Sequence, residues 1–213
     1  EPEEWARIAR ELRARGIGYV SDEIYLDLQH GDVSHGSMWQ HSDLGVVLSG
    51  LSKSHGLAGW RIGWAIVAPS LAQPLTALHQ HLVTSACTLV QEAAIAAFDD
   101  PEAASVPDRL RQTLAANRAL AVGKLSDAGW EIAAGDGAFY LWVRVPGVDD
   151  DFAFAHHLLE DARVITIPGR AFGDAGHGYL RISYSIDAPQ LSEAIDRIVA
   201  SAQRFPRRTP SQA

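Results

Sequence analysis

Three short apolar runs, each followed by polar or glycine-rich residues, constrain the fold most. They occupy residues 17–20, 46–51 and 62–68, and their length and β-branched content predict buried strands. An amphipathic helix over residues 2–15 precedes the first run, with Gly16 placed to end it. The succession of helix, glycine, strand and polar residues predicts a layered α/β sheet, in which ligands bind at the carboxyl ends of the strands.

Side chains that could bind a ligand or react with it follow the first two predicted strands. Asp22 and Tyr25 come after the first strand, Lys53 comes after the second, and Arg61 follows Lys53 by eight residues in a glycine-rich stretch. A lysine amine condenses with an aldehyde, and a guanidinium binds phosphate. Pyridoxal phosphate carries both groups. By themselves, the lysine and arginine would be more typical of a solvated surface loop, and Asp22 of a helix or turn cap.

Bulk composition narrows the class of protein. The 213 residues include 47% apolar residues and a formal net charge of −8, which argues against nucleic acid and anionic membranes as partners. The only cysteine, Cys87, predicts a reducing, cytoplasmic location. The histidine pairs at positions 79 and 81 and at 156 and 157 lack a third ligand at usable spacing, so we expect no metal site.

The remainder of the chain mixes helices and strands. Residues 71–98 are predicted to be largely helical, with a break at 84–88 whose hydroxyl groups cap the next helix. A long helix follows at 109–127. Further strands are expected at 130–132, 138–145, 164–167 and 179–184, helices at 151–162 and 189–203, and a disordered tail at 205–213. This second pattern predicts a small α+β domain.

Five motifs occur in an order that resembles a known family. The chain is similar to the fold-type-I, class I/II aminotransferases, a group that includes bacterial aspartate aminotransferases. The motifs are Ser21-Asp22-Glu23-Ile24-Tyr25, Ser52-Lys53 with Gly59-Trp60-Arg61-Ile62-Gly63, Gly137-Ala138-Phe139-Tyr140, Pro168-Gly169-Arg170-Ala171-Phe172-Gly173, and Leu180-Arg181-Ile182-Ser183.

The resemblance implies a role for each matching residue. Lys53 would be the catalytic Schiff-base lysine that holds pyridoxal 5′-phosphate. Asp22 would pair with the pyridine nitrogen, and Tyr25 would donate to the phenolic oxygen. Arg61 would bind the cofactor phosphate, together with Ser52. Arg181 would bind the α-carboxylate of the substrate, although an ordinary surface ion pair remains the alternative for this arginine.

The resemblance also implies an architecture. Residues 1–104 would form the C-terminal half of a large cofactor-binding domain, part of a mostly parallel three-layer α/β/α sheet. Residues 105–213 would form a small α+β C-terminal domain that begins with a long interdomain helix. The family's amino-terminal half is missing from the sequence, so we expect a truncated protein whose sheet exposes apolar surface and whose activity in isolation is poor.

Three functions are compatible with the sequence. The first is a transaminase that moves an amino group between an L-amino acid and a 2-oxo acid, as a homodimer. The second is a carbon–sulfur β-lyase on the same fold, which the segment Asp22-Glu23-Ile24 and the segment Leu57-Ala58-Gly59 also resemble. The third is a non-catalytic, effector-binding domain of a transcription regulator.

Overall fold

The chain forms two compact units, residues 1–111 and residues 112–213. The computed structural model describes residues 2–31, 35–133 and 135–206. Helix α6 (Val106–Asp127) contains the point at which the two units divide. The domain boundary expected between residues 104 and 105 stays a prediction. Most of the tail expected to be disordered, residues 207–213, lies outside the described residues.

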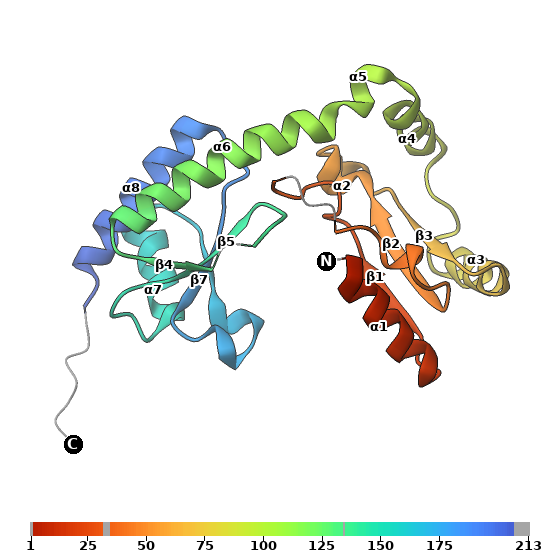
Figure 1. The fold of residues 1–213 in the computed structure, drawn as a ribbon. Coiled ribbons are helices and arrows are strands. Elements are labelled where there is room, and N and C mark those ends of the chain that lie inside the picture. Colours follow the sequence, from red (N-terminus) through yellow and green to blue (C-terminus); the bar gives the residue numbers. More distant parts are fainter. Residues whose placement is uncertain (1, 32–34, 134, 207–213) are drawn as a thin grey trace. The chain divides into compact units, whose positions relative to one another are not determined.

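Unit 1 is built on a three-stranded sheet in the order β1-β2-β3 (Figure 1). Strand β1 (Tyr19–Asp22) pairs in parallel with β2 (Gly45–Gly50), and β2 pairs in antiparallel fashion with β3 (Gly63–Val67). A mostly parallel sheet was expected, and of these two strand pairs only β1 with β2 is parallel. The first strand was predicted too early, because its pairing with β2 extends as far as Asp22, which lies opposite Leu48.

The helices of unit 1 largely follow the sequence pattern. Helix α1 (Pro2–Ala14) ends as expected at Gly16, whose φ of 62° is left-handed, and the Ile17 N–H donates to the Leu12 carbonyl at 2.9 Å. The other helical segments are η1 (Met38–Gln40), α2 (Leu51–Ser54), η2 (Ala58–Trp60), α3 (Pro69–Val83), α4 (Thr88–Asp99) and α5 (Pro101–Ala104).

The break between α3 and α4 is present, but its predicted capping is wrong. Thr84, at the end of α3, has a positive φ of 63°. The residue that precedes α4 is Cys87, and no side-chain hydrogen bond caps that helix. A side-chain cap occurs instead at α5, where Asp100 accepts from the N–H groups of Glu102 and Ala103 at 2.8 and 3.0 Å.

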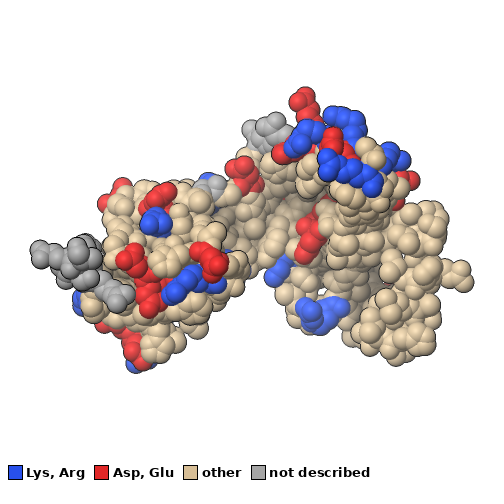
Figure 2. All heavy atoms as spheres, turned by 90° about the horizontal axis from the view of Figure 1, so that it is seen from below, with Lys and Arg blue, Asp and Glu red and all other residues tan. Residues whose placement is uncertain are grey.

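Unit 1 leaves much of its apolar surface exposed. On α3, Leu78 is 54% and Leu82 is 73% exposed, and on β3 Trp64 and Ile66 are also exposed. Residues 62–91 contain no Lys, Arg, Asp or Glu, and Figure 2 shows a broad part of this unit's surface without any of the four. Exposed apolar area of this extent is typical of a surface that another protein segment covers.

Unit 2 contains a four-stranded antiparallel sheet in the order β4-β5-β7-β6. Its strands are β4 (Glu131–Ala133), β5 (Tyr140–Arg144), β6 (Ile167–Pro168) and β7 (Tyr179–Ser183). The strand predicted over residues 164–167 is wrong except at its last residue, since only Ile167 and Pro168 pair with β7. Ile165 is 78% exposed. The β-branched residues here have a high strand propensity, but the position is not buried in a sheet.

Helices pack on one face of this sheet to form the main core. They are α6, α7 (Asp151–His157), which continues into the π-helical turn η3 (Leu158–Ala162), and α8 (Ala188–Arg204). Helices α6 and α8 run side by side (Figure 1), where Lys124 contacts Asp196 at 2.5 Å. The core residues are all buried: Leu114, Ala121, Leu125, Leu141, Val143, Phe154, Leu158, Leu180, Ile182, Leu191, Ile195 and Ile198.

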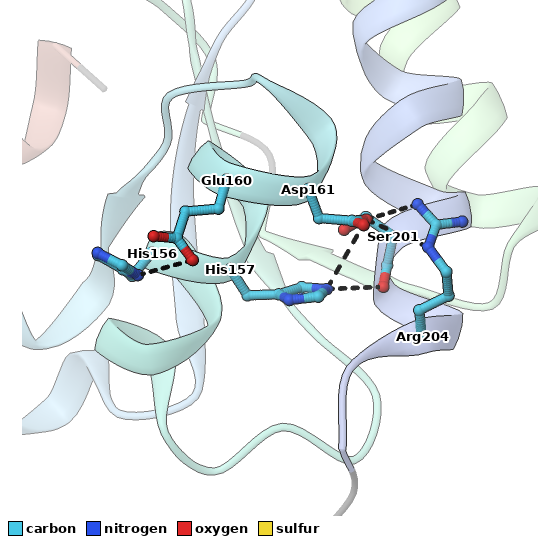
Figure 3. Close-up of polar contacts among 6 residues, drawn as sticks. All are labelled: His156, His157, Glu160, Asp161, Ser201 and Arg204. Carbon is cyan, nitrogen blue, oxygen red and sulfur yellow. Dashed lines mark hydrogen bonds and ion pairs between the residues drawn. The ribbon is translucent and has the colours of Figure 1, made fainter.

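Polar contacts join the end of α8 to the end of α7 and to the turn η3 (Figure 3). Arg204 donates to the Asp161 carboxylate at 2.5 and 3.2 Å, and His157 Nε2 lies 3.2 Å from the Ser201 carbonyl. The hydrogen bond from Arg204 holds the pKa of Asp161 below its ordinary value. These contacts fix the last turn of the chain's closing helix against unit 2.

Candidate active site

The carboxyl ends of β1 and β2 lie at the same edge of the sheet of unit 1. The two strands are parallel, and the Glu23 N–H, just after β1, donates to the Leu48 carbonyl of β2 at 2.8 Å. Asp22 is the last residue of β1, and Lys53 stands three residues after Gly50, the last residue of β2. Parallel pairing therefore brings both segments to the edge at which α/β sheets bind ligands.

Lys53 lies beside Tyr25. Its Nζ atom is 5.9 Å from the centroid of the Tyr25 ring, and both side chains are half-buried. Lys53 and the half-buried Ser52 belong to the single turn α2, which Leu51, only 1% exposed, anchors in the core. The structure thus brings together two of the predicted cofactor ligands, although they are far apart in the sequence.

Asp22 is exposed and makes a local turn contact. Its Oδ1 atom accepts from the Ile24 N–H at 3.2 Å, which is the turn-capping role that the sequence also allowed. This contact orients the carboxylate on the segment that leads to Tyr25.

Arg61 follows the short helix η2, which packs against α2. Its backbone has a left-handed φ of 57°, and its Nη1 donates to the Ala58 carbonyl at 2.9 Å. A left-handed arginine is uncommon, and such strain concentrates at functional sites. The exposed guanidinium keeps further N–H groups for an anion.

Arg181 belongs to unit 2 and is not among the residues that the structure brings together in unit 1. It lies in β7 opposite Trp142 of β5. Its Cζ atom is 4.3 Å from the centroid of the Tyr140 ring and 4.8 Å from that of Phe172. The sequence motifs that contain these two rings predicted no role for them. Alternation along residues 140–144 places Tyr140 and Trp142 on one face, but only the register with β7 puts Arg181 there.

His55 adds an orphaned polar atom near the lysine. Its Nδ1 is 3.0 Å from Ser54 Oγ, while its buried Nε2 has no hydrogen-bond partner among the described residues. The centroid of its ring lies 6.3 Å from the centroid of the Phe98 ring. A buried ring nitrogen of this kind requires a partner, and the sequence marked His55 only as a pocket-lining or loop-capping residue.

The donor set fits pyridoxal phosphate. It comprises a primary amine on Lys53, a guanidinium on Arg61, a carboxylate on Asp22 and a phenol on Tyr25. These groups match an aldehyde, a phosphate, a ring nitrogen and a phenolic oxygen, respectively. In the described part of the chain, no group of three or more His, Cys, Asp or Glu residues is arranged to hold a metal ion.

The family model for "Aminotransferase class I and II" matches residues 1–198. The chain belongs to this family. The resemblance inferred from the five motifs is therefore confirmed. Membership also confirms the expected cofactor at the level of the family, because class I and II aminotransferases depend on pyridoxal phosphate.

Similar proteins carry aminotransferase names. A probable N-acetyl-LL-diaminopimelate aminotransferase of Bacillus subtilis is 32% identical over 201 residues, which are 92% of this chain and 50% of the relative. A valine–pyruvate aminotransferase of Mycobacterium tuberculosis is 35% identical, over 92% of this chain and 52% of the relative.

Solved structures agree with these relatives. An aminotransferase from Mycobacterium tuberculosis superposes with a TM-score of 0.90 at 33% identity, over 96% of this chain and 54% of the other. An aromatic aminotransferase from Pyrococcus horikoshii gives a TM-score of 0.89 at 26% identity, over 96% of this chain and 56% of the other. The likeness confirms the α/β class, and the chain spans about half the length of these aminotransferases.

Proposed function

We propose that this protein is a pyridoxal-phosphate-dependent transaminase that moves an amino group between an L-amino acid and a 2-oxo acid. One observation carries the proposal. Beyond the carboxyl ends of two parallel strands, Lys53 Nζ lies 5.9 Å from the centroid of the Tyr25 ring, in a chain that belongs to the aminotransferase family. Both residues are half-buried, whereas a lysine and a tyrosine on a solvated loop would be exposed.

Each residue of the site has a part in the proposal. Asp22 pairs with the ring nitrogen of the cofactor, Tyr25 donates to its phenolic oxygen, and Arg61, with Ser52, binds its phosphate. Bound pyridoxal phosphate supplies an electron-accepting ring that stabilises negative charge at the amino acid's Cα.

Lys53 has two tasks in the reaction. It would hold the cofactor covalently, and its Nζ, displaced from the cofactor by the amino group of the substrate, would take the proton from the substrate Cα. Arg181 binds the α-carboxylate and so orients that Cα. The proposal thus assigns proton transfer to Lys53 and binding to the other residues of the site.

Residues 1–213 contain two lysines, Lys53 and Lys124, so the site of attachment can be tested by comparing them. Borohydride reduction of the cofactor-loaded native protein, followed by peptide mass mapping, should place the cofactor on Lys53. The Lys53→Ala variant should lose both the adduct and amino-group transfer. The Lys124→Arg variant is the matched control, since it keeps the ion pair with Asp196 and should retain both. An adduct that persists in Lys53→Ala would contradict the proposal.

A second measurement separates the possible reactions. We expect amino-group transfer from a panel of L-amino acids to depend strictly on an added 2-oxo acid. Release of pyruvate and sulfide from cystathionine without a 2-oxo acid would instead indicate a β-lyase. Cofactor binding without turnover of either kind would indicate an effector-binding domain.

The proposal includes a homodimer in the cytoplasm. The exposed apolar surface of unit 1 supports an interface, and the single free cysteine, Cys87, suits a reducing compartment. In the described residues, no helix is long and apolar enough to cross a membrane. Light scattering of the native protein tests the oligomeric state.

A further inference from the structure

One face of the sheet in unit 2 carries a row of aromatic rings and guanidinium groups. In the antiparallel register of β5 and β7, Trp142 lies opposite Arg181 and Arg144 lies opposite Tyr179. Because side chains alternate along a strand, these four share one face with Tyr140. The other face carries the buried residues Leu141, Val143, Leu180 and Ile182. Arg181 is therefore separated from the core and belongs to the aromatic face.

The guanidinium of Arg181 makes cation–π contacts with two aromatic rings. Its Cζ lies over Tyr140 at 4.3 Å and over Phe172 at 4.8 Å. The Phe172 ring packs edge to face against Trp142, with the ring centroids 5.5 Å apart. Trp142 stacks on Tyr179, with a centroid distance of 5.6 Å. None of the described residues forms a hydrogen bond or ion pair with this guanidinium. Contacts to aromatic rings stabilise the positive charge without an oxygen acceptor, so the N–H groups of Arg181 can still bind a planar carboxylate.

The loop that carries Phe172 is itself fastened. Phe172 ends the short helix η4 (Gly169–Phe172), and the neighbouring Arg170 binds Asp151 through its backbone N–H at 2.8 Å and through Nε at 2.6 Å. The Asp151 side chain is only 1% exposed. Gly169 and Gly176 cross so closely that a Cβ on either would overlap the other's carbonyl oxygen. These contacts fix the position of the backbone that carries Phe172.

The strand that carries Tyr140 is fastened in a similar way. Tyr184 donates its N–H to the Phe139 carbonyl and its hydroxyl to the Ala138 carbonyl, both at 3.0 Å. Ala138 has a left-handed φ of 62°, a conformation that persists only where the surroundings enforce it. Both rings that touch Arg181 thus come from segments held by buried contacts.

We propose that Tyr140 and Phe172 are positioning residues that orient Arg181 for the α-carboxylate of the substrate. The inference rests on the proposed function, in which Arg181 binds that carboxylate. A free arginine side chain samples many rotamers and loses that freedom on binding. Contact with two rings restricts the arginine beforehand, so that less of this freedom is lost when the carboxylate binds.

The test uses the native holoprotein and the best amino acid from the transamination panel. Its probe is the carboxylic acid that lacks that amino acid's amino group, and calorimetry gives the dissociation constant. Phe172→Leu and Tyr140→Leu should each weaken binding by about 3- to 30-fold, the range expected for losing one cation–π contact. The KM of the amino acid should rise by a similar factor, with kcat nearly unchanged.

Variants that keep a ring give the decisive comparison. Phe172→Tyr and Tyr140→Phe should bind the acid as the unchanged protein does. Phe152→Leu is the matched control, because the Phe152 ring lies 5.3 Å from the Arg170 guanidinium and not against Arg181. Phe172 is 54% exposed, so its truncation leaves the core intact, and circular dichroism checks that the variants are folded.

The inference and the proposed function fail in different ways. If Arg181→Gln abolishes binding of the acid while Phe172→Leu and Tyr140→Leu leave it unchanged, the positioning role is overturned and the role of Arg181 stands. If Arg181→Gln itself leaves binding unchanged, the proposed role of Arg181 is overturned. Equal weakening by Phe172→Leu and Phe172→Tyr would also contradict the inference.

Discussion

At the scale of single residues, backbone strain falls on two of the motif segments. Arg61 and Ala138 have φ values of 57° and 62°, which cost free energy for any residue with a Cβ atom. Arg61 belongs to the predicted cofactor site, and Ala138 lies two residues before Tyr140, whose ring contacts Arg181. Both are held by specific hydrogen bonds, from Arg61 to the Ala58 carbonyl and from Tyr184 to the Ala138 carbonyl.

Asn117 is a buried residue whose removal should be costly. It is 3% exposed, and its Nδ2 donates to the carbonyls of Tyr184 and Ile186 at 2.9 and 2.8 Å. Asn117→Ala leaves both carbonyls unsatisfied and should lower the free energy of unfolding by about 2–3 kcal/mol. Urea denaturation measures the change. The exposed Gln112→Ala, on the same helix, is the control; an equally small effect of both variants would contradict the prediction.

At the scale of elements, the start of α7 shows adjacent aspartates with different functions. Asp150 caps the helix by accepting from the Ala153 N–H at 3.2 Å, and it also accepts from Arg170 at 2.7 Å. Asp151 turns inward and binds Arg170 through two further hydrogen bonds. The sequence predicted an acidic helix start that favours the helix dipole, while the ion pair to a residue of the later loop depends on tertiary structure.

Asp151 should make stability depend on pH in the acid range. Burial alone raises the pKa of Asp151, but the hydrogen bonds from Arg170 outweigh it and leave the pKa below the ordinary 3.8. A lowered folded-state pKa stabilises the protein above the unfolded-state pKa, and this stabilisation is lost as the pH falls through the folded-state value. Thermal melting should therefore show a larger deficit for Asp151→Asn at pH 7 than at pH 3.

The exposed Asp174→Asn, in the neighbouring segment η5 (Asp174–Gly176), is the matched control for Asp151→Asn. It should melt close to the unchanged protein at both pH values, since a solvated carboxylate contributes little. A deficit for Asp151→Asn that is the same at both pH values would show that the ion pair with Arg170 does not govern the acid sensitivity.

At the scale of the whole molecule, the two units differ in how well they bury apolar side chains. Unit 2 has a continuous core between its sheet and helices. In unit 1, large residues such as Leu82 and Leu89 remain 73% and 72% exposed. The chain also spans about half the length of its relatives. This difference fits the prediction that unit 1 is part of a larger sheet domain.

Residues 1–213 by themselves should bind pyridoxal phosphate weakly and turn over poorly, because unit 1 would lack the surface that covers its apolar side chains. Visible absorbance of the purified chain during cofactor titration measures binding, and Lys53→Ala supplies the baseline. Binding of a hydrophobic dye should report the exposed surface. Tight, Lys53-dependent absorbance from these residues alone would contradict the expectation.

The sequence by itself determined the family, the α/β class and the positions of most helices, and it named candidate site residues whose roles stay predictions. It succeeded where the signal is local: the glycine that ends α1, the β-branched run of β2, and the motif that surrounds Lys53. It failed at β1's bounds, at residues 164–166 and at the cap of α4, because strand limits and caps depend on partners that propensity does not contain.

Only the tertiary structure decided which of these residues meet. Parallel pairing of β1 with β2 places Lys53 beside Tyr25, and the register of β5 with β7 places Arg181 among Tyr140, Trp142 and Phe172. Such contacts join segments tens of residues apart, so no local pattern encodes them. Apolar burial selects one register, because a shift of one residue would move every side chain of a strand to the opposite face.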